Sequence, residues 1–235
     1  VDGRVYTRPC RTKMMTFYFV YPNPSIFVPD TEKCPSSWLI HLRYGTKNSL
    51  KNKEKRLDYI GRVTVEKEQR ESRSGEKFTE ELANLGIELN EHQKEQFDQY
   101  YELLVEWNKV MNLTGITEYE EVNLKHFTDS LSIARVKDMH QVQSVIDIGT
   151  GAGFPGVPLK IAFPHLEACL LDSLKKRVNF LEETFALLKL ENITAIHGRA
   201  EEFAKNKAYR EQYDLCVSRA VSNLATLSEY CLPYV

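Results

Sequence analysis

Apolar residues recur at helical spacing in the middle of the chain. Asn90 and Gln93 have the spacing of a capping box, in which each side chain bonds the other residue's backbone N–H at a helix start. Beyond them, apolar positions follow at steps of three and four. This pattern predicts one long helix that ends near residues 112–115, with a buried face formed by Phe97, Tyr100, Leu104, Trp107 and Met111.

From residue 141 onward, short apolar runs alternate with helical segments. Four runs, at residues 144–149, 168–171, 193–196 and 214–218, are predicted strands, and the first, which ends in glycines, is typical of a buried parallel strand. The segment after the second run has helical spacing, and Ser173 can cap that helix. Strand and helix alternate as in βαβ units. The sequence therefore predicts an α/β fold, a Rossmann-like sheet preceded by a helical lead-in.

The charge separates a leader from the rest of the chain. Residues 1–77 hold 16 Lys and Arg against 9 Asp and Glu, and residues 78–235 hold 15 against 24, within a net charge of −2. The basic leader has no sustained period and few large apolar side chains, so we expect poor order there. A nucleic-acid-binding arm is the alternative interpretation. We expect a helical lead-in over residues 78–138 and a core over residues 139–235, truncated because a doubly wound sheet usually has more strands.

The remaining composition narrows the class of protein. The five cysteines are an odd number without a C-x-x-C pair, which favours reduced thiols in the cytoplasm. No apolar run reaches the roughly 20 residues that cross a bilayer. No Cys and His spacing indicates a metal site. We expect a monomer that binds neither membrane nor metal.

A glycine-rich segment, Asp147–Gly156, directly follows the first predicted strand. Its glycines allow tight turns and close approach of a ligand to the backbone. Asp172 lies 23 residues beyond Gly149, at the end of the second strand, where a carboxylate can accept both ribose hydroxyls of a nucleoside. Together they indicate an adenosine-type ligand. A glycine turn beside an unrelated acidic helix cap is the structural alternative.

Which adenosine ligand binds stays open on these residues. Gly151, Gly153 and Gly156 also satisfy the G-x-G-x-x-G dinucleotide pattern, which suits NAD. Asp147, just before the glycines, suits the sulfonium cation of S-adenosylmethionine better than a pyrophosphate. The chemistry favours S-adenosylmethionine, with an NAD-linked oxidoreductase as the alternative.

Longer motifs resemble one known family. The stretch Val105–Thr114 contains W-N-x-x-x-N-L-T, the stretch Lys125–Ser130 contains H-x-x-D-S, and both stand in register with Asp147–Pro158 and Leu171–Arg177. These motifs, over residues 78 to 235, resemble the RsmG (GidB) family of bacterial 16S ribosomal RNA guanine-N7 methyltransferases. The resemblance implies rRNA methylation with S-adenosylmethionine and, as partner, 16S ribosomal RNA or the small ribosomal subunit. A catalytically silent nucleotide-binding or ribosome-binding protein is the second alternative.

The resemblance also implies cofactor contacts, one position at a time. Gly149 would pass the methionine part, Phe154 would line its far side, and Asp172 would take the ribose hydroxyls. Ala200 and Glu201 would border the adenine, and Arg219, after the fourth strand, would face cofactor and substrate.

Other polar residues have structural or functional interpretations. The sequence Ser218–Val221 lacks the polar motif of enzymes that methylate exocyclic amines, and guanine N7 already exposes a lone pair, so we expect no general base. We expect His126 and Asp129 to make structural hydrogen bonds that fix the lead-in against the core. His197 is expected to be a packed or capping residue. Two interpretations stay open, contact with RNA phosphates or a solvated helix face, for Lys175, Lys176 and Arg177.

Overall fold

The computed structural model describes residues 4–9, 15–20 and 75–235 of the chain. Contacts divide the chain into two units, residues 1–24 together with 77–235, and residues 25–76. Most of the basic leader, residues 10–14 and 21–74, lies outside the described residues, so the expectation of poor order there stays a prediction.

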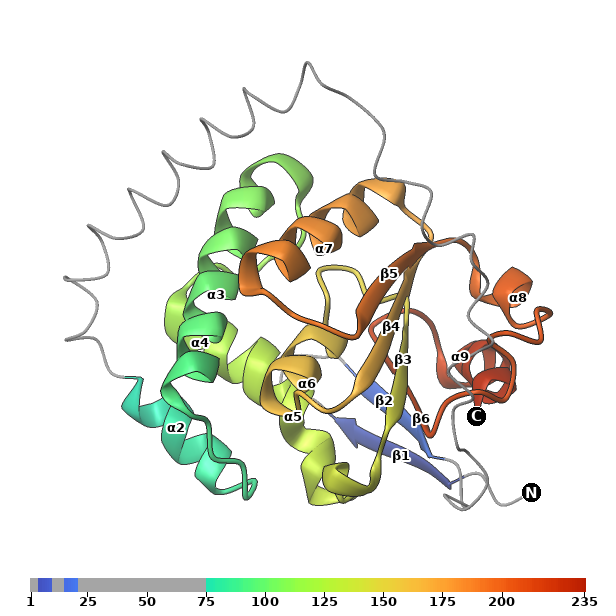
Figure 1. The fold of residues 1–235 in the computed structure, drawn as a ribbon, viewed down its shortest axis with the longest axis horizontal. Helices are drawn as coiled ribbons and strands as arrows, with labels where there is room; N and C mark the ends of the chain where they lie inside the picture. Colours follow the sequence, from blue (N-terminus) through green and yellow to red (C-terminus); the bar gives the residue numbers. More distant parts are fainter. Residues whose placement is uncertain (1–3, 10–14, 21–74) are drawn as a thin grey trace. The chain divides into compact units, whose positions relative to one another are not determined.

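Four adjacent parallel strands form one side of a six-stranded sheet (Figure 1). Their order across the sheet is β6-β3-β4-β5, and each corresponds to a predicted run: β3 (Ser144–Ile148), β4 (Glu167–Asp172), β5 (Ile193–His197) and β6 (Leu215–Arg219). The predicted parallel α/β sheet is therefore confirmed. Buried residues along β3, β4 and β6 explain their continuous apolar runs.

A hairpin from the basic leader extends this sheet. Strands β1 (Arg4–Pro9) and β2 (Met15–Val20) pair antiparallel, and β2 pairs antiparallel with β6. The sequence pattern did not indicate these strands, because residues 1–77 show no sustained period. The sheet is therefore mixed, with an antiparallel edge beside the parallel core.

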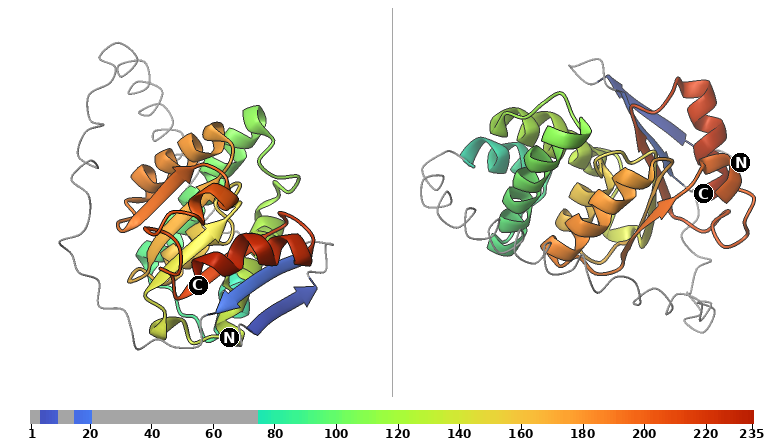
Figure 2. Two further views of the ribbon diagram at one scale, coloured as in Figure 1. Left: turned by 90° about the vertical axis from the view of Figure 1, so that its right-hand side faces the viewer. Right: turned by 90° about the horizontal axis from the view of Figure 1, so that it is seen from above.

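Helices cover both faces of the sheet (Figures 1 and 2). On one face lie α6 (Gly156–Ala162) and α7 (Lys175–Leu188), with α3 (Glu91–Met111) packed outside them. On the other face lie α8 (Ala200–Phe203) and α9 (Leu224–Cys231). The other helical segments are α2 (Glu76–Ala83), α4 (Tyr119–Val122), a π-helical turn (Asn123–Thr128), α5 (Asp129–Leu131) and 3₁₀ turns at Ser132–Arg135, Met139–Gln141 and Leu232–Tyr234. Within the described residues, no helix has the length and apolar character that a membrane span requires.

Both predicted ends of helix α3 are confirmed. The Asn90 side chain accepts from the Gln93 backbone N–H, and the Gln93 side chain accepts from the Asn90 backbone N–H, each at 2.9 Å. The helix ends where Asn112 adopts a left-handed conformation with φ of 50°. Phe97, Tyr100 and Leu104 are buried as expected, whereas Trp107 and Met111, at the end of the predicted face, are only partly buried.

Two buried glutamines attach α3 to the ends of the helices beneath it. Gln93 Nε2 donates to the Ile161 carbonyl oxygen in α6, and Gln96 Nε2 donates to the Leu188 carbonyl oxygen in α7, each at 2.8 Å. The last carbonyls of a helix have no partner within that helix. Residues of the lead-in therefore donate hydrogen bonds to carbonyl oxygens at the ends of α6 and α7 that have no partner within those helices.

The second of these bonds gives a stability prediction. Replacing Gln96 by Leu leaves the buried Leu188 carbonyl without a donor, which costs about 1–3 kcal/mol. We expect the urea midpoint of unfolding to fall accordingly. Gln141→Leu is the control, because Gln141 is exposed and bonds only the neighbouring Asp138 side chain. Equal midpoints for the two variants would show that the bond contributes nothing.

Candidate functional site

The glycine loop lies at the carboxyl edge of the sheet, where the parallel strands end together. Gly149, Gly151 and Gly153 have positive φ values of 68°, 63° and 98°, which side chains rarely allow. A Cβ on Gly149 would lie 2.4 Å from Cγ2 of Val221, which follows β6. Glycine at this position therefore lets the segments after β3 and β6 meet.

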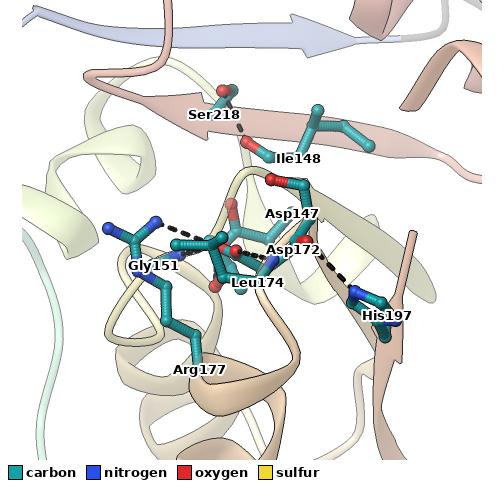
Figure 3. Close-up of polar contacts among 10 residues, drawn as sticks. Asp147, Ile148, Gly151, Asp172, Leu174, Arg177, His197 and Ser218 are labelled. Carbon is teal, nitrogen blue, oxygen red and sulfur yellow. Dashed lines mark hydrogen bonds and ion pairs between the residues drawn. The ribbon is translucent and has the colours of Figure 1, made fainter. Parts of the chain in front are cut away.

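The Asp172 carboxylate joins the end of β4 to the glycine loop (Figure 3). Its Oδ2 accepts from the Gly151 backbone N–H at 2.9 Å, and its Oδ1 accepts from the Leu174 backbone N–H at 2.9 Å. Arg177 Nη1 lies 3.4 Å from Oδ2. The structure thus brings the predicted pair of elements, glycine loop and acid, into direct contact.

One predicted helix cap is wrong. Helix α7 begins after Leu174, and Ser173 makes no capping bond. The Asp172 carboxylate accepts a hydrogen bond from the Leu174 backbone N–H. Asp172, and not Ser173, therefore bonds the segment that leads into α7. Asp172 therefore connects the glycine loop to the segment before α7. The sequence predicted a contact with a ribose for this residue, and did not indicate that it joins these two segments.

A buried carboxylate also supports the loop from within the sheet. Asp147 Oδ2 accepts from the Thr150 hydroxyl at 2.7 Å and from the Gly156 backbone N–H at 2.9 Å. Its Oδ1 is buried without a partner in the part of the chain that the structure describes. Burial raises the pKa of Asp147 to about 7, although both of these hydrogen bonds oppose the shift.

The site fits a cationic nucleoside cofactor better than a dinucleotide. A Cβ built on Gly151 meets only a backbone oxygen at 4.0 Å, so a ligand can approach the loop closely there. The Asp172 carboxylate contacts the loop, where a negative charge repels a pyrophosphate and attracts a sulfonium. A carboxylate accepts about four hydrogen bonds, and Gly151, Leu174 and Arg177 take three of them at Asp172, which leaves one for a ribose hydroxyl. These residues fit S-adenosylmethionine.

Arg219 is held by three residues of the helical lead-in. Its Nη2 donates to His126 Nδ1 at 3.0 Å, and its Nη1 lies 3.3 Å from Asp129 Oδ2 and 3.4 Å from the Lys125 carbonyl oxygen. The guanidinium carbon lies 4.8 Å from the centre of the Phe154 ring. The expected structural hydrogen bonds of His126 and Asp129 are therefore confirmed, and their partner is a residue of β6.

His126 is neutral in this arrangement. Burial and the neighbouring Arg219 charge lower its pKa to about 3. Because Nδ1 accepts from Arg219, the proton is assigned to Nε2, which lies 2.7 Å from the Thr114 hydroxyl oxygen. The ring stacks on Phe154 with centroids 4.6 Å apart. Thr114 and His126 belong to the two longest motifs, so the network connects both to the end of β6.

The other predicted cofactor residues lie along the same edge but in different surroundings. Phe154 is buried, with its ring near those of Tyr100 and Phe127. Ala200 is buried at the start of α8, where its carbonyl oxygen accepts from the Tyr234 hydroxyl at 2.7 Å, and Glu201 is exposed. No hydrogen bond joins Ala200 or Glu201 to the other predicted site residues within the described ranges.

The remaining candidate residues have structural contacts. His197 Nε2 lies 3.0 Å from the Ser173 carbonyl oxygen, as expected for a packed histidine. Lys175 pairs with Glu182 at 3.6 Å on an exposed surface. Residues 75–235 and the two described strands contain no group of three His, Cys, Asp or Glu side chains that could hold a metal ion.

Sequence reasoning missed Tyr100 as a support of the glycine loop. Its hydroxyl donates to the Ala152 carbonyl oxygen at 2.5 Å, and a Cβ on Gly153 would lie 2.7 Å from the same hydroxyl. The helical spacing identified Tyr100 as a core residue, but nothing local to α3 indicates which loop it contacts.

The two shifted pKa values predict opposite pH dependences of stability. An acid whose pKa is raised on folding, as at Asp147, loses stability as pH rises from about 4 to 7. A histidine whose pKa is lowered, as at His126, loses stability as pH falls from about 6.5 to 3. Each effect is on the order of 4 kcal/mol and they offset each other in the intact protein.

We therefore expect Asp147→Asn to expose the histidine effect. The free energy of unfolding of this variant should rise with pH between 4.5 and 6.5, whereas that of His126→Gln should fall over the same range. Urea unfolding at several pH values measures both slopes. Parallel pH profiles for the two variants would contradict the assignment.

Comparison with known proteins agrees with the motifs and the loop geometry. The profile of the family described as "GidB: rRNA small subunit methyltransferase G" matches residues 93–235. Three proteins with the name ribosomal RNA small subunit methyltransferase G are similar to this chain. That of Lachnoclostridium phytofermentans is 56% identical over 69% of this chain and 67% of its own length, and that of Brevibacillus brevis is 55% identical over 68% and 67%. That of Exiguobacterium sp. is 56% identical over 66% of each chain, so the match spans about two thirds of these relatives. The chain belongs to the GidB family of rRNA small subunit methyltransferases.

Proposed function

We propose that this protein transfers a methyl group from S-adenosylmethionine to N7 of a guanine in 16S ribosomal RNA, acting in the cytoplasm as a monomer. The observation that carries the proposal is the Asp172 carboxylate in contact with the glycine loop, in a member of a methyltransferase family. The substrate is naked RNA or the small ribosomal subunit. The NAD-linked oxidoreductase and the silent binding protein are not supported by the relatives.

Each proposed cofactor contact uses a residue at the carboxyl edge of the sheet. Asp172 accepts from the ribose hydroxyls, which must share the carboxylate with the Gly151 and Leu174 amides and the Arg177 guanidinium. Gly149 and Phe154 lie beside the methionine part, and Ala200 and Glu201 border the adenine. A bound S-adenosylmethionine supplies a methyl group made electrophilic by its sulfonium.

Catalysis in this proposal is mainly alignment. Guanine N7 carries a lone pair that needs no deprotonation, so the protein has to hold N7 in line with the methyl. Such positioning can contribute up to about 7–11 kcal/mol. Arg219, which lies against the Phe154 ring, bonds the Asp129 carboxylate, and this pairing agrees with a role other than proton transfer for both residues.

The cofactor assignment predicts a ligand preference. S-adenosylhomocysteine should bind in a calorimeter, and NAD should give no measurable heat. Asp172→Asn should weaken S-adenosylhomocysteine by about 10-fold to 100-fold, since a hydrogen bond to a charged group contributes about 1.5–3 kcal/mol. Asp138→Asn is the control, because that exposed carboxylate caps only a distant 3₁₀ turn. NAD binding that depends on Asp172 would favour the oxidoreductase.

The activity itself is tested with RNA. Incubation of the protein with 16S RNA or small subunits and S-adenosylmethionine should produce 7-methylguanosine, which mass spectrometry of nuclease digests detects. S-adenosylhomocysteine binding without any methylated nucleoside would leave only the silent binding protein.

A further inference from the structure

We propose that Arg219 selects guanine over other purines by donating to O6 of the base that is methylated, and that His126 and Asp129 are positioning residues that aim it. The inference rests on the proposed function, because it names how the same site recognises its substrate. The observation that supports it is that the hydrogen bonds of Arg219 use three of the five N–H donors of its guanidinium.

The bonds of Arg219 leave two N–H groups free. A guanidinium has five N–H donors. Three of them are directed to the Asp129 carboxylate, the Lys125 carbonyl oxygen and His126 Nδ1. Nε–H and the second hydrogen on Nη2 have no acceptor among the described residues. Arg219 is thus fixed by the lead-in and keeps two donors for a ligand.

The surroundings restrict how this guanidinium can move. Its side chain is 3% exposed, and the Phe154 ring lies against it. The carboxylate and the neutral imidazole both accept from it, and neither can donate to it in the assigned state. In this proposal the base that is methylated lies on the side of Phe154 where the guanidinium is, 4.8 Å from the centre of that ring.

The chemistry of the purine edge then favours guanine. N7 is beside O6 in guanine, an acceptor, and beside the N6 amino group in adenine, a donor. Arginine has only donors, so it bonds O6 and opposes the adenine amino group. A site built around such a bond rejects an analogue that lacks the acceptor, because buried donors stay unpaired.

Three versions of the substrate test the inference. The methylated guanine is located first by mass spectrometry, and 16S RNA is then ligated around synthetic segments that carry guanosine, inosine or 2-aminopurine at that position. Inosine keeps O6 and lacks the 2-amino group, whereas 2-aminopurine lacks O6. We expect inosine to react within about 3-fold of guanosine and 2-aminopurine at least about 100-fold more slowly.

Variants separate recognition from the intrinsic reactivity of N7. The guanosine to 2-aminopurine rate ratio should fall at least about 10-fold in Arg219→Lys and in Asp129→Asn, while Asp138→Asn keeps the ratio of the intact protein. Rates are counted per molecule that binds S-adenosylhomocysteine, so a variant that folds poorly does not distort the ratio. Circular dichroism melting reports the stability of each variant separately.

The outcomes distinguish this inference from the proposed function. An unchanged ratio in Arg219→Lys, or equal rates on guanosine and 2-aminopurine RNA in the intact protein, overturns the role of Arg219 and leaves methyl transfer standing. A ratio lost in Arg219→Lys but kept in Asp129→Asn overturns the positioning role. No methylation of any RNA by the intact protein overturns the proposed function, and this inference with it.

Discussion

Backbone N–H groups of the glycine loop need acceptors, and buried carboxylates supply them. Asp147 accepts from Gly156, and Asp172 accepts from Gly151. A loop of this kind contains few side chains that could hold its conformation, so its shape depends on these two acids. Val221 packs closely against Gly149 of this loop, and the segment before α7 is joined to the loop through Asp172.

The helical lead-in contributes to the site through polar groups as well as through apolar packing. Gln93 and Gln96 satisfy the carboxyl ends of α6 and α7, and Tyr100 bonds the loop itself. Beyond α3, His126 in the π-helical turn and Asp129 in α5 bond Arg219. The lead-in is thus structurally part of the site, although none of its residues belongs to the loops at the carboxyl ends of the parallel strands.

Features set by neighbouring residues were predictable from the sequence, and features set by distant residues were not. The capping box of α3 and the four parallel strands follow from spacing and apolar runs, and both are confirmed. The cap of α7 was misassigned because Ser173 has the right residue type, whereas the Asp172 carboxylate takes the bond. The antiparallel hairpin and the support of the loop by Tyr100 depend on contacts that no local pattern encodes.

The bond between Arg219 and His126 joins residues 93 positions apart, and this separation has a consequence for synthesis. Ribosomes add about 5–20 residues per second, so α3 and its neighbours emerge about 5–20 s before the residues of β6. In the first part of that interval the apolar face of α3, with Phe97, Tyr100 and Leu104, lacks α6 and α7, the helices that pack on it in the folded protein. We expect nascent chains to expose this face for seconds, during which chaperones that bind hydrophobic surfaces can act on the unfinished chain.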